Sequence, residues 1–236
     1  MPSHTLQAYD EELKFLATRI AQMGGHAERM VEEAVAALVN SDEALAQAVI
    51  RNDRVLDEAE REIDDKAVLI IARRQPMAID LREIIGAIRI SADLERVGDL
   101  GKNIAKRVAA AGQTRQPARL FRGIEALAEL ALTQLKDVLD AYGSRTIDRI
   151  GAVRDRDEEI DAKYTSLFRE LLTYMMEDPR NITACTHLLF CAKNIERIGD
   201  HATNIAEIVH YIVTGSQLPA ERPKEDESHR VVVSGD

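Results

Sequence analysis

Glu-Arg-Val-Gly-Asp at residues 95–99 and Glu-Arg-Ile-Gly-Asp at residues 196–200 are two copies of one motif, each followed by Asn-Ile-Ala, at 103–105 and 204–206. Both copies lie where apolar residues recur at helical spacing. The Glu, Asp and Asn of each copy are four residues apart, so on a helix their oxygen atoms line one face. The duplication predicts two related halves, with one half of a binding site on each motif helix.

Helical spacing extends outward from the motifs through most of the chain, as in Leu13, Leu16, Ile20 and Met23, and strand-like alternation is scarce. Breaks fall near residues 40–42, 75–76, 112–117, 142–144, 178–179 and 215–219. We therefore expect six helices of roughly 26 to 36 residues, about 40 to 50 Å long. Their predicted N-caps include Ser41, Ser144 and Asp178.

Long helices joined by short turns form up-and-down bundles. A hydrophobic content of 45% with only 4% aromatic residues also favours helices, with a core of Leu, Ile, Val and Ala. The predicted fold is all-α, with two tandem, pseudo-symmetric three-helix bundles. The first bundle spans residues 1–112 and the second residues 117–215, with the linker between them, and residues 216–236 form a tail of disorder-prone composition.

The charge and the apolar runs of the chain exclude several classes of function. A formal net charge of -10 and a pI near 5.2 disfavour binding to nucleic acid. Apolar runs such as residues 68–72 are too short to cross a bilayer, and the N-terminus lacks a signal peptide, so we expect a cytoplasmic protein without direct membrane insertion. We expect Cys185 and Cys191 to be buried thiols in a reducing compartment.

A second acidic pair, also four residues apart, precedes each motif on the preceding helix. Residues equally far from the turn of an antiparallel hairpin lie at the same height, and these pairs come level with the Glu and Asp of the motifs, in two layers one helical turn apart. The count fixes their height but not the direction in which they point. The candidate site residues are Asp53, Asp57, Glu95 and Asp99 in the first half and Asp157, Asp161, Glu196 and Asp200 in the second.

Crowded carboxylates repel each other, by about 0.2 to 0.5 kcal/mol per pair on a helix, and a metal cation would offset that cost. Oxygen ligands suit Mg, Mn, Fe or Ca better than structural zinc, and the identity of the metal stays open among Fe, Mn, Mg and Zn. Our hypothesis is one multinuclear metal patch per half. The alternative is a solvated face on which Arg96, Arg197, Lys102 and Lys106 form surface salt bridges of little energetic weight.

Few other residues suggest chemistry. Glu207 and His210 match one Glu-x-x-His of the ferritin-like di-iron bundles, which use two such motifs. His201 is a candidate for the rim of a metal site, and Gly98 and Gly199 predict tight helix crossings. The sequence has no phosphate-binding Gly-rich loop and no nucleophile elbow, so we predict no enzymatic activity.

At the level of whole motifs, the chain resembles the PhoU family, the accessory regulators of bacterial phosphate-specific transport. The resemblance covers residues 1 to about 215. It rests on the duplicated motif, on Gln75-Pro76 leading to Asp80-Leu81-Arg82, and on residues 168–172 and 175–179. It implies two three-helix bundles related by a pseudo-two-fold axis, often assembled as homodimers, with metal clusters on the eight carboxylates named above. Leu100-Gly101 stands where the second copy has His201-Ala202, so the two sites are expected to differ.

The resemblance also implies a function. Members of the family are negative regulators of phosphate uptake and of the phosphate-starvation response. When phosphate is plentiful, they link the ATPase of the ABC phosphate transporter to a membrane sensor histidine kinase. The mechanism so implied is adaptor binding and not catalysis.

Two other readings stay open from the residues alone. One is a carboxylate-bridged di-metal oxidase of the ferritin-like kind, which needs ligands from four helices around one site. The other is a purely structural helical scaffold with solvated acidic faces. The duplication favours the adaptor, because each half has its own acidic set on two helices.

Overall fold

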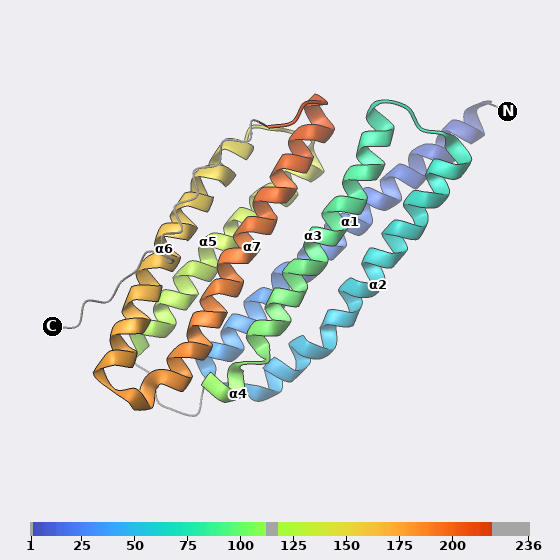
Figure 1. Ribbon diagram of the computed structural model, residues 1–236. Helices are drawn as coiled ribbons and strands as arrows, with labels where there is room; N and C mark the ends of the chain where they lie inside the picture. The colour runs from blue at the N-terminus through green and yellow to red at the C-terminus, as the bar shows by residue number, and fades with distance from the viewer. Residues whose placement is uncertain (1, 112–117, 219–236) are drawn as a thin grey trace.

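The computed structural model describes residues 2–111 and 118–218, and within these ranges the chain forms six long helices and two short ones (Figure 1). The predicted linker at 112–117 and residues 219–236 of the predicted tail, which begins at residue 216, lie outside the described residues. The elements are α1 Pro2–Asn40, α2 Glu43–Arg74, α3 Ile79–Ala105, α4 Val108–Ala111, α5 Ala118–Ser144, α6 Ile150–Glu177, the 3-10 helix η1 Pro179–Asn181 and α7 Ile182–Thr214.

The six long helices form two three-helix units that lie side by side, as Figure 1 shows, and the predicted all-α architecture is thereby confirmed. Helices α1, α2 and α3 pack together in one unit, and α5, α6 and α7 in the other. Helix α3 packs against α7 and helix α1 against α5, so both units contribute to one continuous core of mainly Leu, Ile, Val and Ala side chains. None of the described helices is long and apolar enough to cross a membrane.

The ends of the helices differ in part from the sequence prediction. Asp42 caps α2 by accepting a hydrogen bond from the backbone N–H of Leu45, whereas Ser41 has a left-handed backbone with a φ of 54° and does not cap the helix. Ser144 is the last residue of α5, and its hydroxyl donates to the Asp140 carbonyl one turn earlier. Asp178 caps the turn η1 that leads into α7, as predicted.

The two motif glycines lie at tight helix crossings. A Cβ atom on Gly98 would overlap Cδ1 of Leu56 on α2. A Cβ atom on Gly199 would lie 3.0 Å from Oε1 of Gln134 on α5 and 3.1 Å from Cδ1 of Ile160 on α6. Glycine is therefore needed at both positions for close packing of the motif helix against its own unit.

Polar and aromatic contacts join the motif helices α3 and α7 across the seam between the units. The guanidinium of Arg82 lies 6.0 Å from the ring centroid of Tyr211 at one end, and that of Arg107 lies 4.1 Å from the ring of Phe190 at the other. Between them Asp93 Oδ1 lies 2.8 Å from Nδ1 of His201. The two motif helices are thus held together along their length.

Candidate functional site

The predicted carboxylates of the first half meet around a lysine. Nζ of Lys102 on α3 donates hydrogen bonds to Oδ2 of Asp53 on α2 and, over 2.6 Å, to Oδ1 of Asp99 on its own helix. Arg96 lies within 3.5 Å of Glu95 and 3.3 Å of Asp99. Two of the four predicted residues are therefore joined across the helices by a cation of the chain itself, which is the salt-bridge arrangement weighed as the alternative to a metal.

Electrostatics in this first cluster differ from one carboxylate to the next. Burial, together with the charges of Asp99, Glu60 and Asp57, raises the pKa of Glu95 to about 6. Burial also disfavours the charged form of Asp99, but hydrogen bonds from Lys102 outweigh it and lower the pKa of Asp99. The cluster therefore combines one carboxylate that is firmly ionised with one that holds its proton more tightly than usual.

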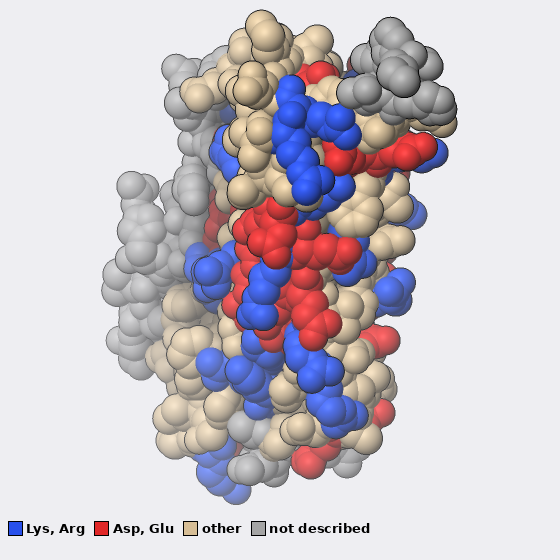
Figure 2. Space-filling view, turned by 90° about the vertical axis from the view of Figure 1, so that its right-hand side faces the viewer, with Lys and Arg blue, Asp and Glu red and all other residues tan. Residues whose placement is uncertain are grey.

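Two further acidic residues belong to the first cluster and were missed in the sequence. Glu60 and Asp64 continue the stripe that begins with Asp53 and Asp57 on α2, at spacings of three and four residues. Burial and the charge of Asp64 raise the pKa of Glu60. Their spacing on α2 is the signal that could have found them, but the second half has Tyr164 where the first has Glu60, so the pattern does not recur in both halves. Figure 2 views the side of the molecule on which α2 lies and shows acidic side chains gathered there among basic ones.

The second cluster has a different set of contacts. Asp157 on α6 accepts a hydrogen bond from the Thr203 hydroxyl on α7 over 3.0 Å. Oε1 of Glu196 accepts from Nζ of Lys193 over 2.7 Å, while Oε2 is buried and has no hydrogen-bond partner. Burial is the main reason that the pKa of Glu196 rises to about 7, and the charges of Asp200 and Asp161 add to it. An acceptor atom buried without a donor is costly unless a proton or a cation reaches it.

Corresponding positions explain why the clusters differ. Thr203 follows Asp200 by three residues, as Lys102 follows Asp99, so the second half has a hydroxyl where the first has an ammonium. Tyr164 follows Asp161 by three residues, as Glu60 follows Asp57, and the ammonium of Lys193 lies 5.0 Å from the Tyr164 ring centroid. The hydrogen bonds of the two clusters therefore differ, through residues other than Leu100 and His201, and a difference in metal or occupancy stays a prediction.

The arrangement of the donor atoms bears on metal binding. Among residues 2–111 and 118–218, no three or more His, Cys, Asp or Glu side chains are arranged to hold a metal ion. Both clusters hold a buried oxygen without a hydrogen-bond partner, Oδ1 of Asp64 in the first and Oε2 of Glu196 in the second, but the first also contains the cation of Lys102. Metal binding by the eight carboxylates stays a prediction, with the second cluster the better fit.

The weaker candidates lie away from the clusters. His201 contacts Asp93 across the seam and not Asp200, and Nδ1 of His210 lies 3.0 Å from the carbonyl oxygen of Ser216 near the end of α7. Cys185 and Cys191 are free, buried thiols, as expected. None of these residues adds a ligand to the acidic clusters in the contacts described here.

The fold and the two clusters define a class of protein: a duplicated helical protein in which each half has an acidic cluster between its second and third long helices. The PhoU domain profile matches residues 20–108 and 124–209. The chain belongs to the PhoU family, and the resemblance noted in its motifs is confirmed.

Relatives and solved structures agree with this assignment. The chain is 68% identical over 224 residues to the "Phosphate-specific transport system accessory protein PhoU homolog" of Rhizobium meliloti, covering 95% of this chain and 94% of the relative. A crystal structure of PhoU from Pseudomonas aeruginosa is 38% identical and covers 88% of this chain and 100% of its own, with a TM-score of 0.82. The regulatory protein PhoU from Streptococcus pneumoniae is 26% identical, covers 89% of this chain and 99% of its own, and also has a TM-score of 0.82.

Proposed function

We propose that the protein is a cytoplasmic regulatory accessory protein of phosphate uptake. One observation supports this most strongly: the relative that is 68% identical over 95% of the chain is named an accessory protein of the phosphate-specific transport system. The acidic residues of both motifs also occur in a compact, duplicated arrangement, with no nucleotide-binding loop in the sequence. The protein acts by binding, as a negative regulator of uptake and of the phosphate-starvation response.

In this proposal the protein is an adaptor with two partners. It associates with the ATPase of the ABC phosphate transporter and with a sensor histidine kinase, and it assembles as a homodimer. Helices as long as α1, with 39 residues, and α7, with 33, offer extended surfaces for such partners. Apolar side chains such as Met77, which is 80% exposed, and Phe190, which is 50% exposed, provide contacts that a partner would bury.

Metal binding is part of the proposal for the acidic clusters. Asp157, Asp161, Glu196 and Asp200 would hold a cation in the second cluster, and Asp53, Asp57, Glu95 and Asp99 would do so in the first once Lys102 has moved aside. A bound divalent cation would supply positive charge that neutralises the carboxylates and ties two helices together. Glu196 is the residue with most to gain, because its Oε2 atom has no donor.

The test is a pull-down from phosphate-replete cells with metal analysis of the same samples. The cluster variant combines Glu95→Gln, Asp99→Asn, Glu196→Gln and Asp200→Asn, which remove charge while keeping side-chain shape. A matched control variant combines Glu58→Gln, Asp65→Asn, Asp155→Asn and Glu159→Gln, four exposed carboxylates of α2 and α6. We expect wild type and control to recover the transporter ATPase and the sensor kinase and to hold metal, and the cluster variant to lose both.

Other outcomes separate the parts of the proposal. Equal recovery of the partners by all three proteins would keep the adaptor and make the clusters structural, which is the scaffold reading of the acidic faces. Absence of both partners from the wild-type sample would contradict the adaptor. Bound iron with iron-dependent oxygen consumption would then favour the di-metal oxidase, although the clusters lie on two separate helix pairs and not around one four-helix site.

A further inference from the structure

A groove follows the other seam of the molecule, between α1 of the first unit and α5 of the second. Two adjoining pockets, of about 880 and about 410 Å³, form it, and both are lined by Glu28 and Lys136. None of the eight carboxylates of the acidic clusters lines these pockets, so the clusters are not part of the groove. The groove is a separate surface feature.

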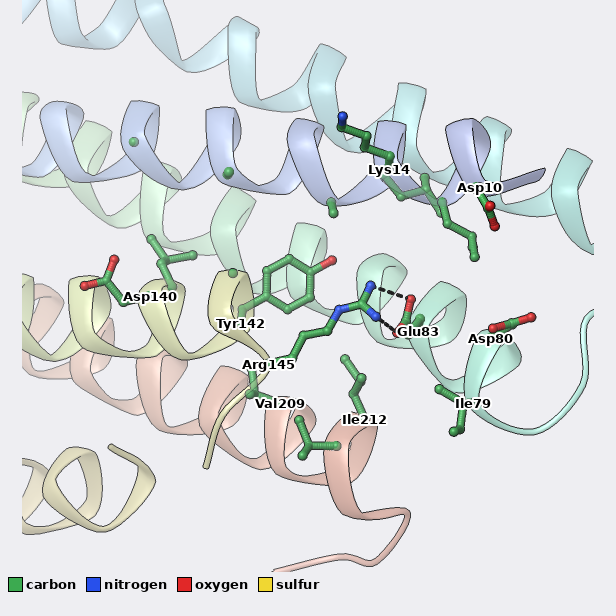
Figure 3. Close-up of a pocket in the computed structure, with 18 of the residues that line it drawn as sticks. Asp10, Lys14, Ile79, Asp80, Glu83, Asp140, Tyr142, Arg145, Val209 and Ile212 are labelled. Carbon is green, nitrogen blue, oxygen red and sulfur yellow. Dashed lines mark hydrogen bonds and ion pairs between the residues drawn. The ribbon is translucent and has the colours of Figure 1, made fainter. Parts of the chain in front are cut away.

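The floor of the larger pocket is apolar. Leu13 and Leu16 of α1, Leu139 of α5 and Val209 and Ile212 of α7 line it. Figure 3 shows Val209 and Ile212 on one helix below Tyr142, with α1 on the opposite side. Such a surface buries the apolar face of a bound segment and would not attract a fully polar one.

Carboxylates dominate the walls of the smaller pocket. Glu28 and Glu32 of α1 face Glu125 and Glu129 of α5, with Lys136 as the cation of this section. Glu28 and Glu32 lie one helical turn apart in this crowded wall, and burial, with the charge of Glu32, raises the pKa of Glu28. A ligand with several positive charges would relieve that crowding.

The larger pocket has the same bias in charge. Asp10, Asp80 and Asp140 line its rim, and its Glu83 is paired with Arg145 over 2.6 Å, as Figure 3 shows. Over both pockets, eight carboxylates line the groove against three cations, Lys14, Lys136 and Arg145. The walls are thus strongly negative above an apolar floor.

The length of the groove indicates the shape of its ligand. Its lining on α1 runs from Asp10 to Ala36, which is roughly 40 Å along a helix at about 1.5 Å per residue. An amphipathic helix of about 20 residues, about 30 Å long, fits within that length. Recognition of amphipathic helices in grooves rests on apolar anchors for affinity and on charge for specificity.

We infer that this groove binds a basic amphipathic helix of a partner protein, with the apolar face of that helix on the floor and its Lys and Arg side chains against the two acidic walls. The inference rests on the proposed adaptor function, for which it names a docking surface. Two other occupants of the groove, a second copy of the chain and its own C-terminal segment, are disfavoured by their charge. A basic segment gains more at these walls than a second copy of the chain, whose net charge is -10, or than residues 219–236, which contain five acidic and three basic residues.

The test measures binding of a fluorescent peptide to the full-length protein by anisotropy. The peptide has about 20 residues of Leu and Lys, with Leu at helical positions i, i+3, i+4 and i+7. A peptide of the same composition in scrambled order and a peptide with Glu in place of Lys are the comparisons. We expect the basic amphipathic peptide to bind at least about tenfold more tightly than either, with an affinity that falls as salt rises.

Two variants locate the binding site. The groove variant combines Glu28→Gln, Glu32→Gln, Glu125→Gln and Glu129→Gln, and we expect binding about tenfold weaker than that of the control variant, which loses the same number of charges from α2 and α6. The second variant, Gly25→Phe, fills the groove sterically, because a Cβ atom at Gly25 has no neighbour within 4 Å. Its control is Gly151→Phe on α6, where a Cβ atom also meets no neighbour within 4 Å.

Several results would overturn the inference. Equal binding of the scrambled or acidic peptide would do so, as would equal weakening by the groove and control variants. If replacing Val231, Val232 and Val233 by Ser increased peptide affinity tenfold, the C-terminal segment would be the occupant. If Gly25→Phe changed the oligomeric state, the occupant would be a second copy. Peptide binding without recovery of the transporter or kinase in the pull-down would contradict the proposed function and leave the groove assignment intact.

Discussion

The ammonium of Lys102 lies 2.6 Å from the carboxylate of Asp99, which precedes it by about one turn on the same motif helix. The same ammonium contacts Asp53 on the neighbouring helix, so a side chain of the protein takes the position between the carboxylates that a bound cation would need. Thr203 stands at the corresponding position of the second motif and donates to Asp157. The two halves therefore have the same arrangement of helices but different charges at corresponding positions of their clusters.

Substitution of Lys102 by threonine is expected to increase metal binding by the first cluster. Lys102→Thr gives the first cluster the residue of the second and removes its internal cation, so we expect more Mn or Fe per chain after incubation with metal and desalting. Elemental analysis provides the measurement. Without metal, the variant should be about 1 to 3 kcal/mol less stable, because Asp53 loses its partner in a buried position. Lys106→Thr, at the exposed residue that caps the C-terminal end of the same helix, is the control, and equal metal content in the two variants would contradict the prediction.

The stability of the metal-free protein is expected to fall as pH rises from about 5 to about 7. The pKa of Glu196 is raised to about 7 in the folded protein, so the folded state holds a proton in this range that the unfolded state has already lost. The proton on Glu196 therefore contributes about 1 to 3 kcal/mol to the free energy of unfolding below pH 5, and this contribution is lost as the pH rises from 5 to 7. Urea unfolding at several pH values measures it. Glu196→Gln should reduce this dependence to the part that Glu95 contributes, while Glu159→Gln, on the surface, should leave it unchanged.

Two glycines are expected to respond in opposite directions to substitution by alanine. Gly25→Ala should stabilise the protein by about 1 kcal/mol, because the new methyl group meets open space and alanine is the better helix former. Gly98→Ala should destabilise it by about 1 to 2 kcal/mol, because the methyl group overlaps the buried Leu56 side chain. Thermal unfolding compares them. Stabilisation by Gly98→Ala would show that α2 and α3 separate at little cost.

Removal of the Arg107 side chain is expected to loosen one end of the seam between the units. Its guanidinium stacks on Phe190 and lies 3.2 Å from Nδ1 of His187. Arg107→Ala should cost about 1 kcal/mol of stability. Burial, assisted by the Arg107 charge, lowers the pKa of His187, so the variant should raise that pKa part of the way towards its ordinary value. Proton NMR titration of His187 measures the change. An unchanged pKa would assign the shift to burial alone.

Much of the fold could be predicted because helical periodicity and turn residues are local properties of the chain. The breaks at 75–76 and 178–179 and the cap at Asp178 are examples. The Ser41 prediction was wrong because Asp42, one residue later, has the better-placed carboxylate. A single residue of offset is enough to change the cap, and the sequence does not resolve it.

The clusters were harder to predict than the helices. Counting from the turns placed the carboxylates at matching heights, but the contacts between them depend on the rotation of each helix about its axis. Lys102 was weighed as a surface partner, yet it donates to carboxylates of two helices. Gln134 of α5, which donates to Thr203 beside Asp157, has no counterpart in the repeat pattern. Such contacts across helices follow from packing and not from spacing along one helix.

The seam between α3 and α7 has a consequence for communication within the molecule. The two helices that bear the acidic motifs also pack against each other across the units, with contacts from Arg82 and Asp93 of α3 and from Arg107 in the turn that follows α3. If a cation bound at one cluster changed the crossing of these helices, the other cluster would respond with the same coupling free energy, because linkage is reciprocal. Helices α1 and α5 pack in the same core as α3 and α7, so we expect a cation that shifts this crossing to change the width of the groove as well.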